Sequence, residues 1–136
     1  VNGSVSFVQQ GEQTMVDARI DGLTPGVHGF HVHEKGDCSA PDAMSAGGHF
    51  NPGSKPHGDP AHADHHAGDF GNLAADAAGN AALKLTIPAK ELTLASDAPH
   101  SVVGRALVVH ADPDDLRTQP TGNSGKRVAC GVVRLQ

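Results

Sequence analysis

Histidine is the residue type whose number and spacing in this chain most clearly indicate chemistry. Eight of the ten histidines lie between His28 and His66. Neutral imidazole is a common metal ligand, and carboxylates complete many such sites. A fold needs histidine only occasionally, so this density predicts a metal centre.

The candidate ligands fall into two sets. The first combines three imidazoles and a carboxylate from one loop, and it suits tetrahedral zinc: His49, His57, His66 and Asp69. The second contains only imidazoles from outside that loop, and it suits copper: His31, His33 and His110. A tetragonal copper site would take a fourth imidazole from the loop, and the spacing alone does not identify which one.

Alternating apolar residues predict the strands that must carry these ligands. We expect a hairpin from residues 4–8 and 16–20 and a third strand over 27–33, where His31 and His33 share one face. Further strands are expected around 83–87, 102–110 and 128–135. Two long polar stretches, 34–80 and 112–126, are expected to be loops, the first of them ordered by metal.

Composition narrows the class of protein. The 136 residues fit one domain, 1–136. The 17 glycines and nine prolines favour an all-β chain with long loops. With six or seven strands, we expect an antiparallel sandwich or a flattened barrel. The formal charge of −5 argues against nucleic acid as a partner. An apolar run of about 18 residues is absent, so no membrane span is expected. Val1 is neither a methionine nor part of a signal peptide, so a targeting segment is expected to be removed or to lie outside this sequence.

The two cysteines, Cys38 and Cys130, are 92 residues apart. If paired, they would remove roughly 4 kcal/mol of unfolded-state entropy and would indicate an oxidising compartment. Two buried free thiols are the alternative.

Several motifs resemble those of the copper/zinc superoxide dismutase family. Its two signature segments are similar to GFHVHEKGD at 29–37 and GNSGKRVACG at 122–131, and further blocks match at 48–52, 66–69 and 108–110. The likeness covers almost the whole chain. It implies a Greek-key β-sandwich or flattened β-barrel, immunoglobulin-like, with long metal-binding and channel loops.

The resemblance also implies a role for each site residue. Copper would be held by His31, His33, His49 and His110, and zinc by His49, His57, His66 and Asp69. His49 would bridge the two metals, and Asp114 would join a copper histidine to a zinc histidine. Arg127 would dock the substrate anion beside copper, Thr121 would border the channel, and Cys38 would pair with Cys130.

The implied activity is that of a superoxide dismutase in antioxidant defence. Superoxide would be disproportionated to dioxygen and hydrogen peroxide by Cu(II)/Cu(I) cycling, with zinc structural and tuning, and with His49 supplying a proton. Exposed cations would assist Arg127 in attracting the anion, the candidates being Lys126, Arg117, Lys55 and Lys35. Solvated surface positions are expected for His28, His62, His65, His100, Asp112 and Asp115.

Three features depart from the cytosolic members of the family. The chain is expected to begin at the family's second strand, with the first strand cleaved, disordered or outside this sequence, and a sheet edge is then expected to lie open. Cys38 follows His33 by only five residues, and the loop from His110 to Arg127 is short. The cysteine placement resembles bacterial secreted members, so we expect a periplasmic or secreted protein rather than a cytosolic one.

Two other functions remain open at this point. A dismutase-like copper chaperone would deliver metal rather than catalyse, but the chain has neither Cys-x-x-Cys nor Cys-x-Cys. A zinc-only or metal-buffering sandwich is disfavoured by the intact set of His31, His33 and His110. Family members occur as dimers and as monomers, so the oligomeric state stays open; a homodimer partner and a copper donor protein are the candidate protein partners.

Overall fold

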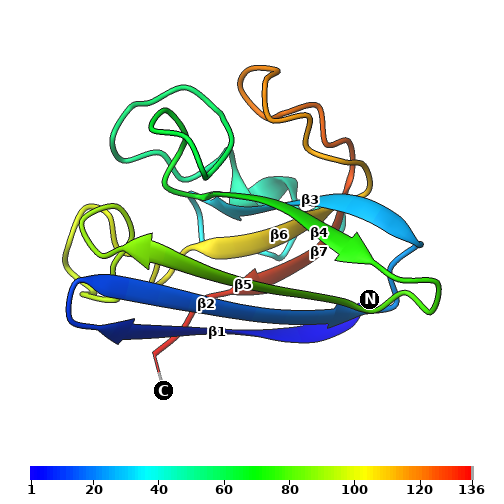
Figure 1. Ribbon diagram of the computed structural model, residues 1–136, viewed down its shortest axis with the longest axis horizontal. Coiled ribbons are helices and arrows are strands. Elements are labelled where there is room, and N and C mark those ends of the chain that lie inside the picture. Colours follow the sequence, from blue (N-terminus) through cyan, green and yellow to red (C-terminus); the bar gives the residue numbers. More distant parts are fainter. Residues whose placement is uncertain (136) are drawn as a thin grey trace.

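Two antiparallel sheets make up the computed structural model, which describes residues 1–135 (Figure 1). The first sheet has the order β1 (Asn2–Gln10), β2 (Gln13–Asp21), β5 (Ala81–Pro88). The second has the order β4 (Asp69–Ala75), β3 (Gly26–His33), β6 (Ala106–His110), β7 (Arg127–Val132). The only helix among the described residues is the 3-10 turn η1 (Met44–Ala46). The all-β sandwich expected from the sequence is confirmed.

The hairpin expected at the start of the chain is β1 and β2. Their register runs from Asn2 opposite Asp21 to Gln10 opposite Gln13. Gly11 turns the chain with φ of +59°, a conformation that glycine adopts without steric cost. Strand alternation then buries every second residue of β2 against the other sheet.

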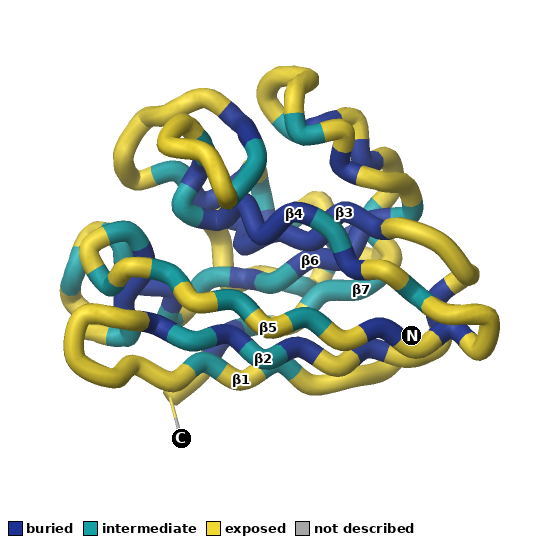
Figure 2. The backbone as a smooth tube through the Cα atoms, viewed as in Figure 1, coloured by how far each residue is buried: buried dark blue, intermediate teal, exposed yellow. Residues whose placement is uncertain are grey.

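The core lies between the sheets, where Figure 2 shows the buried backbone positions. Phe30 of β3 and Phe70 of β4 are fully enclosed, with ring centroids 5.6 Å apart. Aliphatic side chains from both sheets surround them, among them Val16, Val32 and Leu73. The few aromatic residues therefore supply the centre of a largely aliphatic core.

The predicted continuous loop over 34–80 is wrong at its end, where Asp69–Ala75 form strand β4. Its two core residues, Phe70 and Leu73, are three apart instead of two. Gly71 has φ of +78°, and the register of β3 with β4 shifts between Gly29 and His31. This bulge-like irregularity breaks the period of two by which strands are recognised.

Strand β6 is shorter than the predicted 102–110. Arg105 donates its main-chain N–H to the carbonyl of Val102 across a turn in which Gly104 has φ of +82°. The apolar run 102–103 is therefore a turn, and pairing with β3 begins at Ala106.

The outer strands β1 and β7 leave an open groove between the two sheets. The groove has a volume of about 980 Å³, and its walls include Val5, Phe7, Val109, Ala129 and Val133. Among the described residues neither strand has a partner on its outer side. β1 and β7 are therefore edge strands of the described sheets.

Residues 1–135 contain no helix with the length and apolar character needed to cross a membrane.

Candidate metal centre

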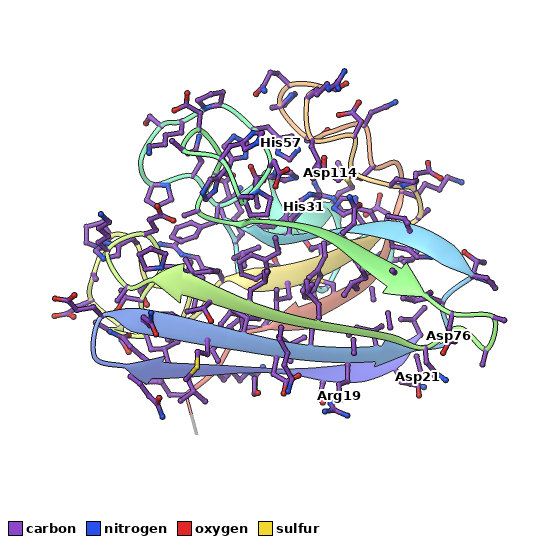
Figure 3. All side chains as sticks on the ribbon, in the orientation of Figure 1. Arg19, Asp21, His31, His57, Asp76 and Asp114 are labelled. Carbon is purple, nitrogen blue, oxygen red and sulfur yellow. A yellow bond between two sulfur atoms is a disulfide. The ribbon has the colours of Figure 1, made fainter. Side chains whose placement is uncertain are left out.

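The predicted ligands converge at one face of the second sheet. β3 carries His31 and His33, and β6 ends at His110. Asp69 begins β4, and the loop between β3 and β4 carries the other ligands, His49, His57 and His66. A bridge between His33 and His49 holds the middle of that loop against β3. Figure 3 shows His31, His57 and Asp114 directed toward one another beneath the two long loops.

The copper-type set consists of four buried imidazoles. Their ligand nitrogens lie within 4.8 Å of one another, and they belong to His31, His33, His49 and His110. The Nε2 atoms of His33 and His110 face each other at 3.4 Å. Three of the rings are oriented through their other nitrogen: His33 Nδ1 donates to the Gly47 carbonyl, His110 Nδ1 to the Gly125 carbonyl, and His31 Nε2 to Asp114. Such contacts leave a defined nitrogen of each ring free for a metal.

Two ring nitrogens of this set are buried without any hydrogen-bond partner among the described residues. They are Nδ1 of His31 and Nε2 of His49. A buried polar atom without a partner costs free energy, and such atoms are rare in folded proteins. A bound cation would satisfy both nitrogens, so four converging imidazoles fit copper.

The zinc-type set surrounds one carboxylate oxygen. Oδ1 of Asp69 lies 3.0 Å from His49 Nδ1, 2.9 Å from His57 Nδ1 and 3.4 Å from His66 Nδ1. The other oxygen, Oδ2, accepts main-chain hydrogen bonds from Gly58 and His66. Three nitrogens and one oxygen in this arrangement fit tetrahedral zinc.

Burial keeps most imidazoles of the copper-type set uncharged. It lowers the pKa of His33 to about 2 and that of His110 to about 3, and the positive charge of Arg127 contributes to both shifts. It also lowers the pKa of His49 to about 4, although the hydrogen bond with Asp69 acts in the opposite direction. These rings are therefore neutral at pH 7 and offer lone pairs to a cation.

Hydrogen bonds keep the two carboxylates and His57 in their charged forms. Burial alone would raise the pKa values of Asp69 and Asp114, but hydrogen bonds from histidines hold both well below the usual range. Burial alone would lower the pKa of His57, but its hydrogen bonds with Asp114 and Asp69 outweigh burial and raise that pKa to about 9. In the metal-free chain His57 is thus protonated on both nitrogens, and a cation at Nδ1 replaces one proton.

Asp114 joins the two ligand sets. Its Oδ2 accepts from His31 Nε2 at 2.7 Å and its Oδ1 from His57 Nε2 at 2.8 Å. Both oxygens are thereby used, so we interpret the cluster of His31, His57 and Asp114 as an orienting contact and not as a third metal site. Gly122 packs against this pair with φ of +73°, and a Cβ there would collide with Asp114 and His57.

Asn72 is a functional residue that the sequence analysis missed. From β4 its amide donates to the Asp114 carbonyl at 3.0 Å and accepts from the Asp114 N–H at 2.8 Å. This paired contact fixes the main chain that carries the joining carboxylate. An asparagine 42 residues from its partner has no signature in the sequence.

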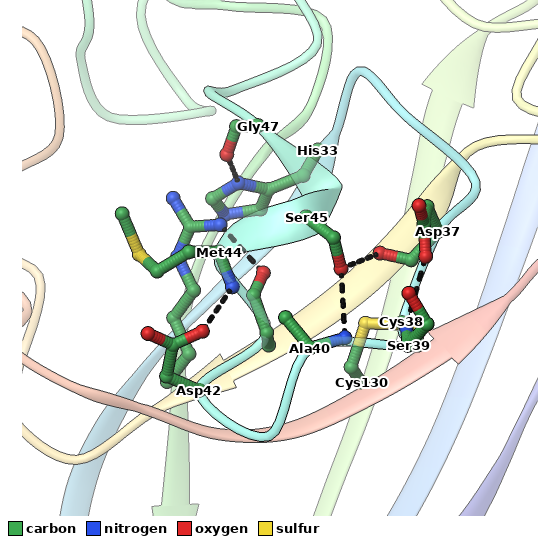
Figure 4. The surroundings of a disulfide bond; sticks show 12 residues. His33, Asp37, Cys38, Ser39, Ala40, Asp42, Met44, Ser45, Gly47 and Cys130 are labelled. Carbon is green, nitrogen blue, oxygen red and sulfur yellow. Dashed lines mark hydrogen bonds between the residues drawn. A yellow bond between two sulfur atoms is a disulfide. The ribbon is translucent and has the colours of Figure 1, made fainter.

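Arg127 stands at the first position of β7, near the copper-type set. Its Nη1 donates to the carbonyl of Ala43 at 2.9 Å. The same loop is tied to β7 by the Cys38–Cys130 disulfide, with Cα atoms 5.7 Å apart (Figure 4). The predicted cysteine pairing is confirmed, and the disulfide holds the loop that supports Arg127.

The remaining predicted positions divide into confirmed and corrected ones. His62, Asp112 and Asp115 are exposed as expected, whereas His65 and His100 are half-buried. Thr121 is half-buried in the loop between β6 and β7, and its role at the channel stays a prediction.

The expectation for His28 is wrong, because this side chain is 3% exposed. Strand alternation places it on the inward face with Phe30 and Val32. Its Nδ1 lies 2.8 Å from the His110 carbonyl, and its Nε2 lies 2.8 Å from the carbonyl and 3.4 Å from the hydroxyl of Thr24, so both ring nitrogens face polar groups of the chain.

Comparison with known proteins bears directly on this site. The family model for copper/zinc superoxide dismutase matches residues 1–133. The chain is 46% identical over 144 residues to an extracellular superoxide dismutase [Cu-Zn] of Brugia pahangi, covering 99% of this chain and 70% of that protein. It is 46% identical over 143 residues to superoxide dismutase [Cu-Zn] 2 of Brassica juncea, covering 100% of this chain and 91% of that protein.

The match extends over both ligand sets, both cysteines and Arg127, and the geometry of the two sets fits one copper and one zinc ion. This chain therefore belongs to the copper/zinc superoxide dismutase family.

Proposed function

We propose that this chain disproportionates superoxide at the centre described above, with its ligand sets divided between two metals. Copper is assigned to His31, His33, His49 and His110, and zinc to His49, His57, His66 and Asp69. The observation that carries the assignment is the pair of buried ring nitrogens without a partner, one in His31 and one in the shared His49.

The reaction consumes two superoxide anions and two protons and yields dioxygen and hydrogen peroxide. When bound, copper supplies the electron exchange through its two oxidation states, while zinc keeps one oxidation state and supplies structure. The residues of the chain bind the anion, orient the ligands and move a proton.

His49 is proposed to hold the moving proton. It is the one residue common to both ligand sets, and its Nε2 lies on the copper side without another partner. Its Nδ1 faces Asp69 and the zinc set, which keeps the ring in place when Nε2 takes up or releases a proton. A buried imidazole held at one nitrogen is a suitable proton donor to a small peroxide product.

Selective loss of one metal tests the assignment. We expect His33→Ala to lose copper and retain zinc, and His57→Ala to lose zinc and retain copper. Copper and zinc counted per chain by elemental analysis after reconstitution with both metals distinguish the two variants. Loss of both metals from both variants, in chains that still fold, would contradict separate sets.

Arg127 is proposed to dock the superoxide anion. Its guanidinium is close enough to His33 and His110 to lower their pKa values, and its contact with Ala43 fixes its direction. A permanent cation beside the metal attracts a small anion despite the negative charge of the whole chain. Lys35, Lys55, Arg117 and Lys126 are all exposed, and their contribution to steering stays a prediction.

We expect Arg127→Met to lower the second-order rate constant for superoxide by about 10-fold or more and to weaken its dependence on ionic strength. The measurement is superoxide decay at several salt concentrations with equal copper content. Arg19→Met is the matched control, because Arg19 lies in β2 at the far side of the molecule from His57 (Figure 3). Equal losses in the two variants would indicate a general charge effect.

Asp114 is proposed to orient one histidine of each set. We expect Asp114→Ala to weaken zinc binding by about 10- to 100-fold, because His57 and His31 lose the acceptor that fixes their rings. Competition with a chelator measures the zinc dissociation constant. Asp112→Ala provides the control, since Asp112 is exposed and carries the same charge. An unchanged zinc dissociation constant in Asp114→Ala would overturn the role.

Export from the cytoplasm is part of the proposal. The disulfide between Cys38 and Cys130 favours an oxidising compartment, and the relative from Brugia pahangi is named extracellular. The more specific proposal is that the exported protein is periplasmic. The homodimer and the copper donor protein stay predictions.

A further inference from the structure

Gln119 makes a paired contact with the main chain of His57. The Oε1 atom of Gln119 accepts from the His57 N–H at 2.7 Å, and its Nε2 donates to the His57 carbonyl at 2.8 Å. The two residues are 62 positions apart, so the contact joins the loop after β6 to the loop before β4.

Side chains hold the main chain around His57: Asn51 bonds both main-chain groups of Lys55, and Asp69 accepts from the N–H of Gly58. Residues 54–59 form no regular secondary structure. Across residues 1–135, neither the N–H nor the carbonyl of His57 has a main-chain partner. The Gln119 carboxamide therefore satisfies both groups.

The position of this main chain matters because the His57 ring makes two directed contacts. Nδ1 lies 2.9 Å from Asp69 and Nε2 lies 2.8 Å from Asp114. Both contacts depend on where the Cα of His57 stands. A side chain that fixes the peptide groups on both sides of that Cα also fixes the origin of the ring.

We propose that Gln119 is a positioning residue for the zinc set, acting through His57. The inference rests on the assignment of His57 to zinc made above. A ligand already held in place need not lose conformational freedom when the metal binds, so its preorganisation strengthens binding. Gln119 itself is exposed, so its effect belongs at the lower end of the range for outer residues, about 10-fold in zinc affinity.

A second glutamine offers a matched control. The Oε1 atom of Gln9 in β1 accepts from the N–H of Leu94 and the hydroxyl of Thr93, both at 2.8 Å. This contact also joins distant segments, but it touches no metal ligand. Methionine has nearly the length of glutamine without its hydrogen-bonding groups. Gln119→Met removes the two bonds to His57 and one to the Arg117 carbonyl at 3.2 Å, and Gln9→Met removes two bonds.

The experiment measures the zinc dissociation constant of the full metal-free chain by competition with a chelator. We compare the unaltered protein, Gln119→Met, Gln9→Met and His57→Ala, and we measure the free energy of unfolding of each metal-free protein. Gln119→Met is expected to raise the dissociation constant about 10-fold. Gln9→Met is expected to leave it within twofold at a comparable loss of stability.

Each other outcome is decisive. A dissociation constant within twofold of the unaltered value in Gln119→Met would overturn the role of Gln119, provided that His57→Ala weakens zinc binding. Equal weakening in both glutamine variants would also overturn it, because the effect would then follow from stability alone. Unchanged zinc binding in His57→Ala would instead overturn the assignment of His57.

Discussion

Replacement of His110 by alanine is expected to reduce superoxide decay to the rate of the copper-free protein. His110 supplies the β6 nitrogen of the copper-type set, 3.4 Å from the nitrogen of His33. Three imidazoles would remain at a site whose geometry needs four. We expect a loss of at least about 100-fold, above the range for outer residues. The measurement is pulse radiolysis on protein whose copper and zinc are counted per chain.

Zinc content provides the internal control for His110→Ala. The zinc-type set does not include His110, so one zinc per chain should remain. His62→Ala is the external control, because His62 is an exposed histidine of the same metal loop. Undiminished catalysis in His110→Ala at equal copper content would show that the reaction does not use this residue.

Removal of the disulfide is expected to have the largest effect on stability. Cys38 and Cys130 close a loop with a sequence separation of 92, so the cross-link lowers the entropy of the unfolded chain. The Cys38→Ala/Cys130→Ala double variant should lose roughly 4 kcal/mol in free energy of unfolding. Denaturant unfolding of the metal-free proteins measures this difference.

Reduction of the unaltered protein provides a check on that value. A reducing agent removes the same cross-link without changing the carbon skeleton of either side chain, so the reduced protein and the double variant should agree within about 1 kcal/mol. Both should also show lower activity, because the loop that carries Ala43 supports Arg127. A loss below about 1 kcal/mol in both would mean that the unfolded chain is already restrained by other contacts.

The strands that follow a simple period of two were predicted from the sequence. β2 buries alternate residues, and β3 places His31 and His33 together on one face. β4 was not predicted, because its two core residues are three positions apart, on either side of an irregularity at Gly71. Local pattern therefore identifies regular strands and fails where the backbone departs from regular pairing.

The ligand sets were predicted because their residue types are distinctive and their spacing resembles a known family. The residues that hold these ligands carry no such signal. Asn72, Gln119 and His28 act through main-chain groups 42, 62 and 82 positions away. Such contacts exist only after the chain has folded, so composition and spacing cannot reveal them.

The shared residues have a consequence for how the two metals are acquired. His49 contributes one ring to both sets, and Asp114 contacts a histidine of each. The affinities for the two ions are then thermodynamically coupled, and the coupling is reciprocal. Under the proposed assignment, whatever factor bound zinc contributes to copper affinity, bound copper contributes to zinc affinity, so the affinity for each ion depends on the occupancy of the other.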